Sequence, residues 1–151
     1  DLARVQELAY GQVDPGAYRP MVEAAEADEF FISETQVGCF GELVVGFVSW
    51  NRDLITWLYV DPAYQRQGIG RKLMRAALDR IGREAWTGML GGNEPALALY
   101  RQCGLEVVFM REGDCEGFPC WTVRLALPTS RMRDPNAKRV KVQSPATARG
   151  S

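Results

Sequence analysis

Two apolar, β-rich runs, followed at once by a helical pattern, constrain this chain more than any other feature. Leu43–Trp50 and Leu54–Val60 flank the polar turn Asn51–Asp53, which predicts an antiparallel hairpin. After Asp61–Pro62 the period changes, and apolar residues recur at i, i+3 and i+4 spacing over Gly70–Gly82. A hairpin that leads directly into an amphipathic helix predicts a mixed α/β (α+β) domain.

The remaining elements are predicted from periodicity and turn residues. Helices are expected over Leu2–Ala9, from Asp14–Pro15 onward, over Pro20–Ala27 and over Asn93–Cys103, with Gly104 ending the last one. Strands are expected over Phe30–Phe40, Ala85–Leu90, Leu105–Arg111 and Trp121–Leu127, with a loop over Glu112–Pro119.

The chain divides into one domain and a basic tail. Its 151 residues are about one domain's worth of chain, and residues 1–127 carry the periodic patterns. Residues 128–151 hold six basic side chains against Asp134 alone and lack a core-forming pattern, so a flexible appendage is expected. With no aromatic residues between those charges, a solvated tail is favoured over a nucleic-acid contact.

The absence of histidine removes several kinds of chemistry. A Ser-His-Asp triad, a Cys-His dyad and a His-ligated metal site are all excluded, and no metal is expected. Any general acid or base must be a carboxylate, tyrosine, cysteine, amine or water.

The cysteines and the apolar runs indicate the cellular compartment expected for this protein. Cys39, Cys103, Cys115 and Cys120 form no C-x-x-C pair, and they are expected to be reduced thiols of a cytoplasmic protein. A Cys115–Cys120 pair or metal site is the less favoured alternative. The longest apolar run, Leu43–Trp50, falls far short of the roughly 18 residues that span a bilayer, so no membrane contact is expected.

A glycine-rich turn joins the second strand of the hairpin to the helix. Gly68 and Gly70 allow close backbone approach, and the start of the helix points unpaired N–H groups into the turn. With Arg66, Arg71 and Lys72 nearby, the turn favours a phosphate ligand. The spacing matches neither G-x-x-x-x-G-K-[ST] nor G-x-G-x-x-G, which excludes a P-loop and a Rossmann fingerprint.

Two segments resemble the motifs of one family. Val60–Gly70, with Gln65, Gly68 and Gly70, is similar to motif A, [Gln/Arg]-x-x-Gly-x-[Gly/Ala], of the GNAT superfamily of N-acetyltransferases. Asn93–Leu105, with its Asn, Ala and Tyr, resembles the family's motif B. The resemblance covers roughly residues 30–127 and implies the GNAT fold, a central, mostly antiparallel sheet flanked by helices.

The resemblance also implies a set of site residues. Backbone amides of Gln67–Arg71 would hold the pyrophosphate of acetyl-CoA, the strand end would pair with its pantetheine arm, and Asn93 would bond a pantetheine amide. Tyr100 would act as general acid for the leaving thiolate. The implied cofactor-binding residues are Leu58, Tyr59, Val60, Gln65, Arg66, Gln67, Gly68, Ile69, Gly70, Arg71, Lys72, Asn93, Ala96 and Tyr100.

Alternatives remain open for some of these residues. Tyr100 lies on an apolar helical face and could be a core residue, and Asn93 is a good helix N-cap. For the general base, Asp53 is the nearest carboxylate, and an ordered water relay is equally compatible. For the family's first strand, which precedes the first helix, two alternatives are open, an absent strand or a truncated chain, because the chain opens at Asp1 without an initiating methionine.

The implied activity is transfer of an acetyl group from acetyl-CoA to a primary amine by direct attack on the thioester. Acidic residues near the expected acceptor regions favour a cationic amine, although a solvated acidic face is equally compatible. These residues are Glu23, Glu26, Asp28, Glu29, Glu112, Asp114 and Glu116. The alternative function is an acyl-CoA-binding sensor or docking module without turnover, and a homodimer is open as an assembly.

Overall fold

The computed structural model describes residues 2–5, 8, 34–115 and 117–139. The expected helices from Asp14 and Pro20, and the start of the strand expected from Phe30, lie outside these ranges. Residues 2–5 and 8 are helical. The elements that follow are β1 (Glu34–Phe40), β2 (Leu43–Asn51), β3 (Leu54–Val60), η3 (Pro62–Tyr64), α3 (Ile69–Ile81), β4 (Trp86–Leu90), α4 (Glu94–Gln102), β5 (Glu106–Cys115), β6 (Phe118–Ala126) and η4 (Arg131–Arg133).

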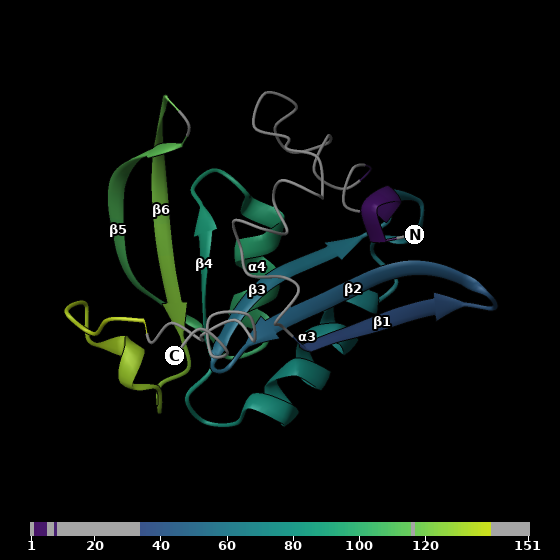
Figure 1. The fold of residues 1–151 in the computed structure, drawn as a ribbon, viewed down its shortest axis with the longest axis horizontal. Coiled ribbons are helices and arrows are strands. Elements are labelled where there is room, and N and C mark those ends of the chain that lie inside the picture. Colours follow the sequence, from purple (N-terminus) through teal and green to yellow (C-terminus); the bar gives the residue numbers. More distant parts are fainter. Residues whose placement is uncertain (1, 6–7, 9–33, 116, 140–151) are drawn as a thin grey trace, which may run out of the picture.

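The described strands form one six-stranded sheet in the order β1-β2-β3-β4-β6-β5 (Figure 1). Every neighbouring pair is antiparallel except β3 and β4, which run parallel because α3 forms the crossover between them. This arrangement confirms the mixed α+β fold and the mostly antiparallel sheet flanked by helices.

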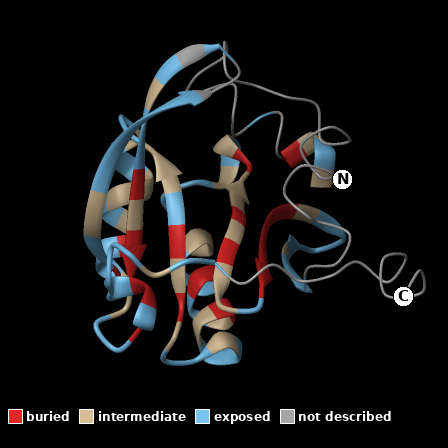
Figure 2. Ribbon diagram, turned by 60° about the vertical axis from the view of Figure 1, so that its left-hand side comes forward, coloured by how far each residue is buried: buried red, intermediate tan, exposed pale blue. Residues whose placement is uncertain are grey.

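The sheet separates two apolar clusters. On one face, α3 and α4 cover a core that includes Val48, Met74 and Leu125, and the β3 residues Leu58 and Val60 pack against it. On the other face, Val5 of the N-terminal helical segment packs with a smaller cluster around Phe47 and Trp57. Figure 2 shows the buried residues along the central strands, whereas β1 at the edge is mostly exposed.

The helix α3 forms where the periodicity predicts it. Leu73, Met74 and Ala77 are its buried residues, at the i, i+1, i+4 positions of one face. Gly68 precedes the helix in a left-handed conformation with φ 82°, which glycine adopts without steric cost. Gly82 follows the helix at φ 88°, and its N–H bonds to the Leu78 carbonyl, so glycines mark both ends.

The last hairpin is longer than expected. Instead of a loop over residues 112–119, the β5–β6 ladder continues through Glu112↔Trp121 and Asp114↔Pro119 to Cys115↔Phe118. Gly113 and the acidic residues favoured a loop, but an exposed hairpin can carry polar side chains on both faces. Cys120 is disulfide-bonded, which corrects the expectation that every cysteine is a reduced thiol, while Cys39 and Cys103 are free.

The expectation of a flexible chain from Pro128 onward is corrected for residues 128–139. Met132 of η4 is fully buried, and Ser130 caps this turn and donates a hydrogen bond to the Glu84 carbonyl (2.8 Å). The guanidinium of Arg124 donates to the carbonyls of Met132, Asp134 and Ala137. One buried methionine and one arginine on β6 therefore hold this segment against the domain. The rest of the expected tail lies outside the described residues.

Candidate active site

The strands β3 and β4 part shortly after they begin. Their register holds only two pairs, Leu54↔Trp86 and Ile55↔Thr87, although β3 continues to Val60 and β4 to Leu90. β3 remains paired with β2 on its other edge, and β4 with β6. Beyond Ile55 the pairing of β3 with β4 therefore ends, and a strand that parts from its neighbour can pair with an extended ligand. We call the gap that opens between β3 and β4 beyond Ile55 and Thr87 the fork, and Figure 1 shows the two strands diverging there.

The turn that contains Gly68 and Gly70, called the glycine turn below, follows β3 and η3 and leads into α3. The first helical hydrogen bond of α3 runs from the Lys72 N–H to the Gly68 carbonyl (3.0 Å). Helix geometry therefore leaves the N–H groups of Ile69, Gly70 and Arg71 without a carbonyl four residues earlier inside the helix. A Cβ at Gly68 would meet no atom within 4 Å other than those of its chain neighbours, so the space around this residue is open. This is the arrangement that binds an anion at the start of a helix.

Gly70 has a second role, which is packing. A Cβ at this position would lie 3.1 Å from Leu99 Cδ2 and 3.6 Å from Val60 Cγ2, closer to Leu99 than ordinary contacts allow. The first turn of α3 thus approaches α4 closely. A side chain at this position would require the Leu99 side chain to shift by a few tenths of an ångström.

The polar residues of the turn are placed differently from one another. The Gln65 side chain donates to the Val60 carbonyl (3.1 Å), so it ties the turn back to the end of β3. Arg66 holds a positive φ of 65°, an uncommon conformation for a residue with a side chain. Arg71 donates to Gln102 of α4 (3.5 Å). Gln65, Arg66 and Gln67 are all exposed, as groups that meet a ligand in solution must be.

Tyr100 lies on the buried face of α4, beside the fork. It belongs to the core cluster, and desolvation by burial raises the pKa of its hydroxyl to about 12. A hydrogen bond with the Thr87 side chain opposes this rise in the pKa. Thr87, the last β4 residue that pairs with β3, donates in turn to the Ile55 carbonyl (2.8 Å). Tyr100 is thus a buried, protonated hydroxyl held at the point where the strands separate.

Asn93 caps α4. Its side-chain oxygen accepts a hydrogen bond from the Ala96 N–H (3.2 Å), which uses the acceptor of the amide and leaves the NH₂ group for other partners. The capping interpretation of Asn93 is therefore confirmed by the structure. Asn93 and Ala96 begin α4 directly after β4, at the same end of the sheet as the fork.

Asp53 lies at the narrow end of the fork, where its carbonyl accepts a hydrogen bond from the Trp86 N–H (3.0 Å), and not beside the glycine turn. It lies in the turn that precedes β3, and β3 is seven residues long, so Asp53 is about 20 Å of strand from Val60. It lines two shallow pockets at the opposite end of the sheet, together with Asn51 and Arg52.

The expected acidic rim is described only in part. Glu112 and Asp114 are exposed on the β5–β6 hairpin, which extends past Leu90 at the open end of the fork. The other acidic residues named above lie outside the described residues. Within the described ranges, no three His, Cys, Asp or Glu side chains form a group that could hold a metal ion. In the same part of the chain, no helix is long and apolar enough to cross a bilayer.

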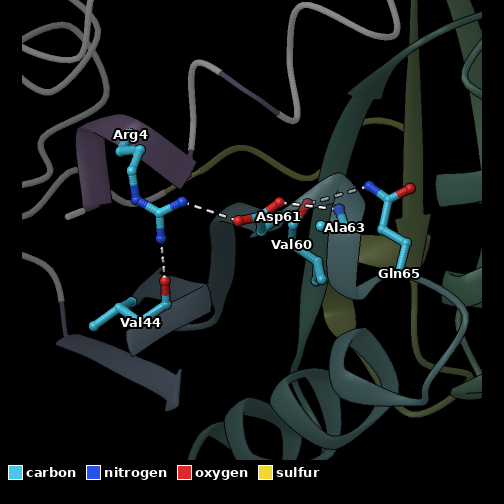
Figure 3. Close-up of polar contacts among 6 residues, drawn as sticks. All are labelled: Arg4, Val44, Val60, Asp61, Ala63 and Gln65. Carbon is cyan, nitrogen blue, oxygen red and sulfur yellow. Dashed lines mark hydrogen bonds and ion pairs between the residues drawn. The ribbon is translucent and has the colours of Figure 1, made fainter. Parts of the chain in front are cut away.

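Two functional candidates were missed in the sequence. Thr87 gives a usable signal, because it is a single hydroxyl in an otherwise apolar strand. Asp61 caps η3, and it also forms an ion pair with Arg4 (2.9 Å; Figure 3). Nothing in the sequence connects two residues that are 57 positions apart.

Solved structures of similar fold are acetyltransferases. The ribosomal-protein-S18-alanine N-acetyltransferase from Escherichia coli is 19% identical, with a TM-score of 0.65 over 93% of this chain and 90% of that one. A putative acetyltransferase from Salmonella typhimurium, solved with acetyl-CoA, is 21% identical, with a TM-score of 0.63 over 90% and 92% of the two chains. At this identity the likeness establishes the fold.

Curated relatives match shorter stretches. N-alpha-acetyltransferase RimI of Mycobacterium tuberculosis is 47% identical over 53 residues, which is 34% of each protein. The [ribosomal protein bS18]-alanine N-acetyltransferase of Escherichia coli is 30% identical over 81 residues, or 51% of this chain and 55% of that protein. The matches thus span from a third to about half of these relatives. The sequence profile of the acetyltransferase (GNAT) domain matches residues 26–107, more than half of the chain. These residues include the glycine turn, the fork and Tyr100, and the chain therefore belongs to the GNAT acetyltransferase domain family.

Proposed function

We propose that this protein is an N-acetyltransferase that moves an acetyl group from acetyl-CoA to a primary amine by direct attack on the thioester. The observation that carries the proposal is the fork between β3 and β4, which opens toward the glycine turn at the start of α3. One extended ligand with an anionic end could pair along β3 and place its phosphates on the turn. Acetyl-CoA has these two parts in this order, and the similar structure from Salmonella typhimurium was solved with it.

In this proposal the open edge of β3 holds the pantetheine arm. The backbone of Leu58, Tyr59 and Val60 supplies N–H and C=O groups to its amides, and the NH₂ group of Asn93 donates to a pantetheine carbonyl. The N–H groups of Ile69, Gly70 and Arg71 bind the pyrophosphate, with Arg66 and Lys72 adding positive charge at the same turn. A backbone N–H of Leu58 or Tyr59 polarises the thioester carbonyl.

The chemical step is a transfer between two nucleophiles. The neutral amine forms a C–N bond at the thioester carbon, the C–S bond of the tetrahedral intermediate breaks, and the sulfur leaves with its electron pair. Tyr100 donates a hydrogen bond to the developing thiolate. Its pKa of about 12 keeps the hydroxyl protonated at neutral pH, so a proton is always present to donate. The proton lost by the amine passes to water, since Asp53 lies at the far end of β3.

The acceptor class is proposed from the relatives and from charge. Two curated relatives are named for N-alpha-acetylation or for acetylation of the alanine of a ribosomal protein. The exposed carboxylates of Glu112 and Asp114, at the open end of the fork, favour a cationic group that approaches there. We therefore propose the α-amino group of a protein N-terminus as the first acceptor to test.

The test is release of free CoA thiol from acetyl-CoA in the presence of an amine panel. The panel contains peptides with a free N-terminus, the same peptides with a blocked N-terminus, a polyamine and free amino acids. Thiol release that requires a free amine, with an acetylated product of matching mass, supports the enzyme. Tight binding of acetyl-CoA without thiol release across the panel would support the alternative, an acyl-CoA sensor or docking module.

A further inference from the structure

The side chain of Arg4 joins three segments that are far apart in the sequence. Its Nη1 donates to Asp61 Oδ2 (2.9 Å), and its Nη2 donates to the Val44 carbonyl (2.6 Å; Figure 3). The two donors belong to one rigid guanidinium, which can hold a carboxylate and a carbonyl in a fixed relation. The N-terminal helical segment is thereby attached to the start of β2 and to the residue that follows β3.

Asp61 determines how the chain leaves β3. Its N–H donates to the Val45 carbonyl (2.7 Å), its Oδ1 accepts from the Ala63 N–H (3.0 Å), and its Oδ2 accepts from Arg4. These contacts cap η3, the single turn that leads into Gln65 and then into the glycine turn. The Asp61 side chain is only 8% exposed, so its charge needs these partners.

Arg4 is itself held in place by packing. The neighbouring Val5 is fully buried against Phe47 and Trp57 on the face of the sheet opposite α3. The position of the Arg4 backbone is therefore fixed by an apolar contact that does not involve Asp61. A displacement of the N-terminal segment would pull directly on the Asp61 cap.

We propose that Arg4 is a positioning residue for the cofactor turn, so that acetyl-CoA binding and docking of the N-terminal segment stabilise each other. This inference rests on the proposed function, because it assigns the glycine turn to the pyrophosphate. Arg4 acts in two ways. It fixes the cap from which the turn begins, and it neutralises a carboxylate near the site where an anionic pyrophosphate binds. Because linkage is reciprocal, the bound cofactor must in turn hold the N-terminal segment in place.

The first measurement is calorimetric titration of the full chain with CoA. Arg4→Met keeps an unbranched apolar stem and removes both donors, and we expect its Kd for CoA to rise about tenfold, within the usual range of coupling between sites. Arg4→Lys should recover part of the lost affinity, since an ammonium group can reach one acceptor but lacks the planar guanidinium that holds two. The matched control is Arg133→Met, because the Arg133–Glu106 ion pair (3.5 Å) is 58% exposed on both sides, and its loss should leave the Kd unchanged.

The second measurement separates positioning from general loss of stability. We expect saturating CoA to slow amide hydrogen exchange in the N-terminal peptide of the wild type, and to lose this effect in Arg4→Met while the turn peptide of the variant is still protected. Should Arg4→Met not fold, Asp61→Asn replaces it, because the amide keeps the Ala63 contact and removes the ion pair. Two results would overturn this inference and leave the proposed function standing. One is a folded variant that binds CoA with the wild-type Kd, and the other is a wild type whose N-terminal amide exchange does not change when CoA binds. Absence of CoA binding by the wild type would overturn the proposed function and the inference with it.

Discussion

The hydroxyl of Thr87 donates a 2.8 Å hydrogen bond to the carbonyl of Ile55, the last residue of β3 that pairs with β4. This bond lies in the buried interior and closes the narrow end of the fork. On its far side the two strands separate, and the same threonine side chain contacts Tyr100. One residue thus connects the point of strand separation to the hydroxyl proposed to meet the leaving group.

Thr87→Val should destabilise the domain at the fork. The change keeps the shape of the side chain but leaves the buried Ile55 carbonyl without its donor, which costs about 1–3 kcal/mol in the free energy of unfolding. Urea denaturation measures this. Thr122→Val is the matched control, because the Thr122 hydroxyl makes a longer, exposed bond to the Arg111 carbonyl (3.2 Å). Equal losses in the two variants would show that the fork bond has no special role.

Gly68→Ala should weaken acetyl-CoA binding. The alanine must adopt a φ of 82°, which costs about 1 kcal/mol, and its methyl group enters the open space at the start of α3. Gly82→Ala is the control, because Gly82 also has a positive φ and open space but lies at the far end of α3. Titration calorimetry should show a loss of affinity in the first variant only. The same affinity in both would remove the turn from the site.

The stability of the protein should depend on Asp61 in acid. The Ala63 N–H, together with the hydrogen bond and charge of Arg4, holds the pKa of this carboxyl below its ordinary value of 3.8. A lowered folded-state pKa contributes stability above the unfolded-state pKa, and this contribution is lost as the pH falls through the folded-state value. The wild type should therefore have a larger free energy of unfolding than Asp61→Asn at neutral pH, and this difference should shrink below pH 3.8. Urea denaturation of both proteins across this pH range measures the difference. A difference in the free energy of unfolding that does not change with pH would contradict the role assigned to the Asp61 carboxylate.

Met132→Ala should destabilise the domain by about 2–5 kcal/mol, the usual cost of emptying a buried methionine site. Met132 is fully buried, although the sequence places it in a region that lacks a core pattern. Met110→Ala is the control, since Met110 is exposed on β5. Thermal unfolding compares the two. A change in Met132→Ala no larger than that in Met110→Ala would mean that residues 128–139 contribute little to the fold.

The sequence predicted those elements whose signal is local. The hairpin of β2 and β3, the helix α3 and the cap at Asn93 all follow from period and turn chemistry over a few residues. The hairpin of β5 and β6 was expected to be shorter, because charged and glycine residues weaken the strand pattern without preventing pairing in an exposed ladder.

The features that the sequence did not predict depend on long-range contacts. Arg4 meets Asp61 across 57 residues, Arg124 meets the carbonyls of Met132 and Ala137, and Thr87 bonds to the Ile55 carbonyl across 32 residues. No local pattern encodes such contacts. Asp53 became a candidate base because it lies beside a central strand in the sequence. The structure shows that β3 runs away from Asp53 toward the glycine turn, so Asp53 lies at the other end of the strand.

The most direct test of the account is acetyl transfer by Tyr100→Phe. Phenylalanine keeps the ring in the core and removes the hydroxyl that lies beside the fork. With a free-amine peptide as acceptor, the wild type should release CoA thiol and form the acetylated peptide in equal amounts. The variant should bind acetyl-CoA with unchanged affinity while kcat falls roughly 100-fold, the loss expected for a proton donor that acts in the transition state. Full activity in a folded Tyr100→Phe variant would contradict the role of this hydroxyl and the mechanism built on it.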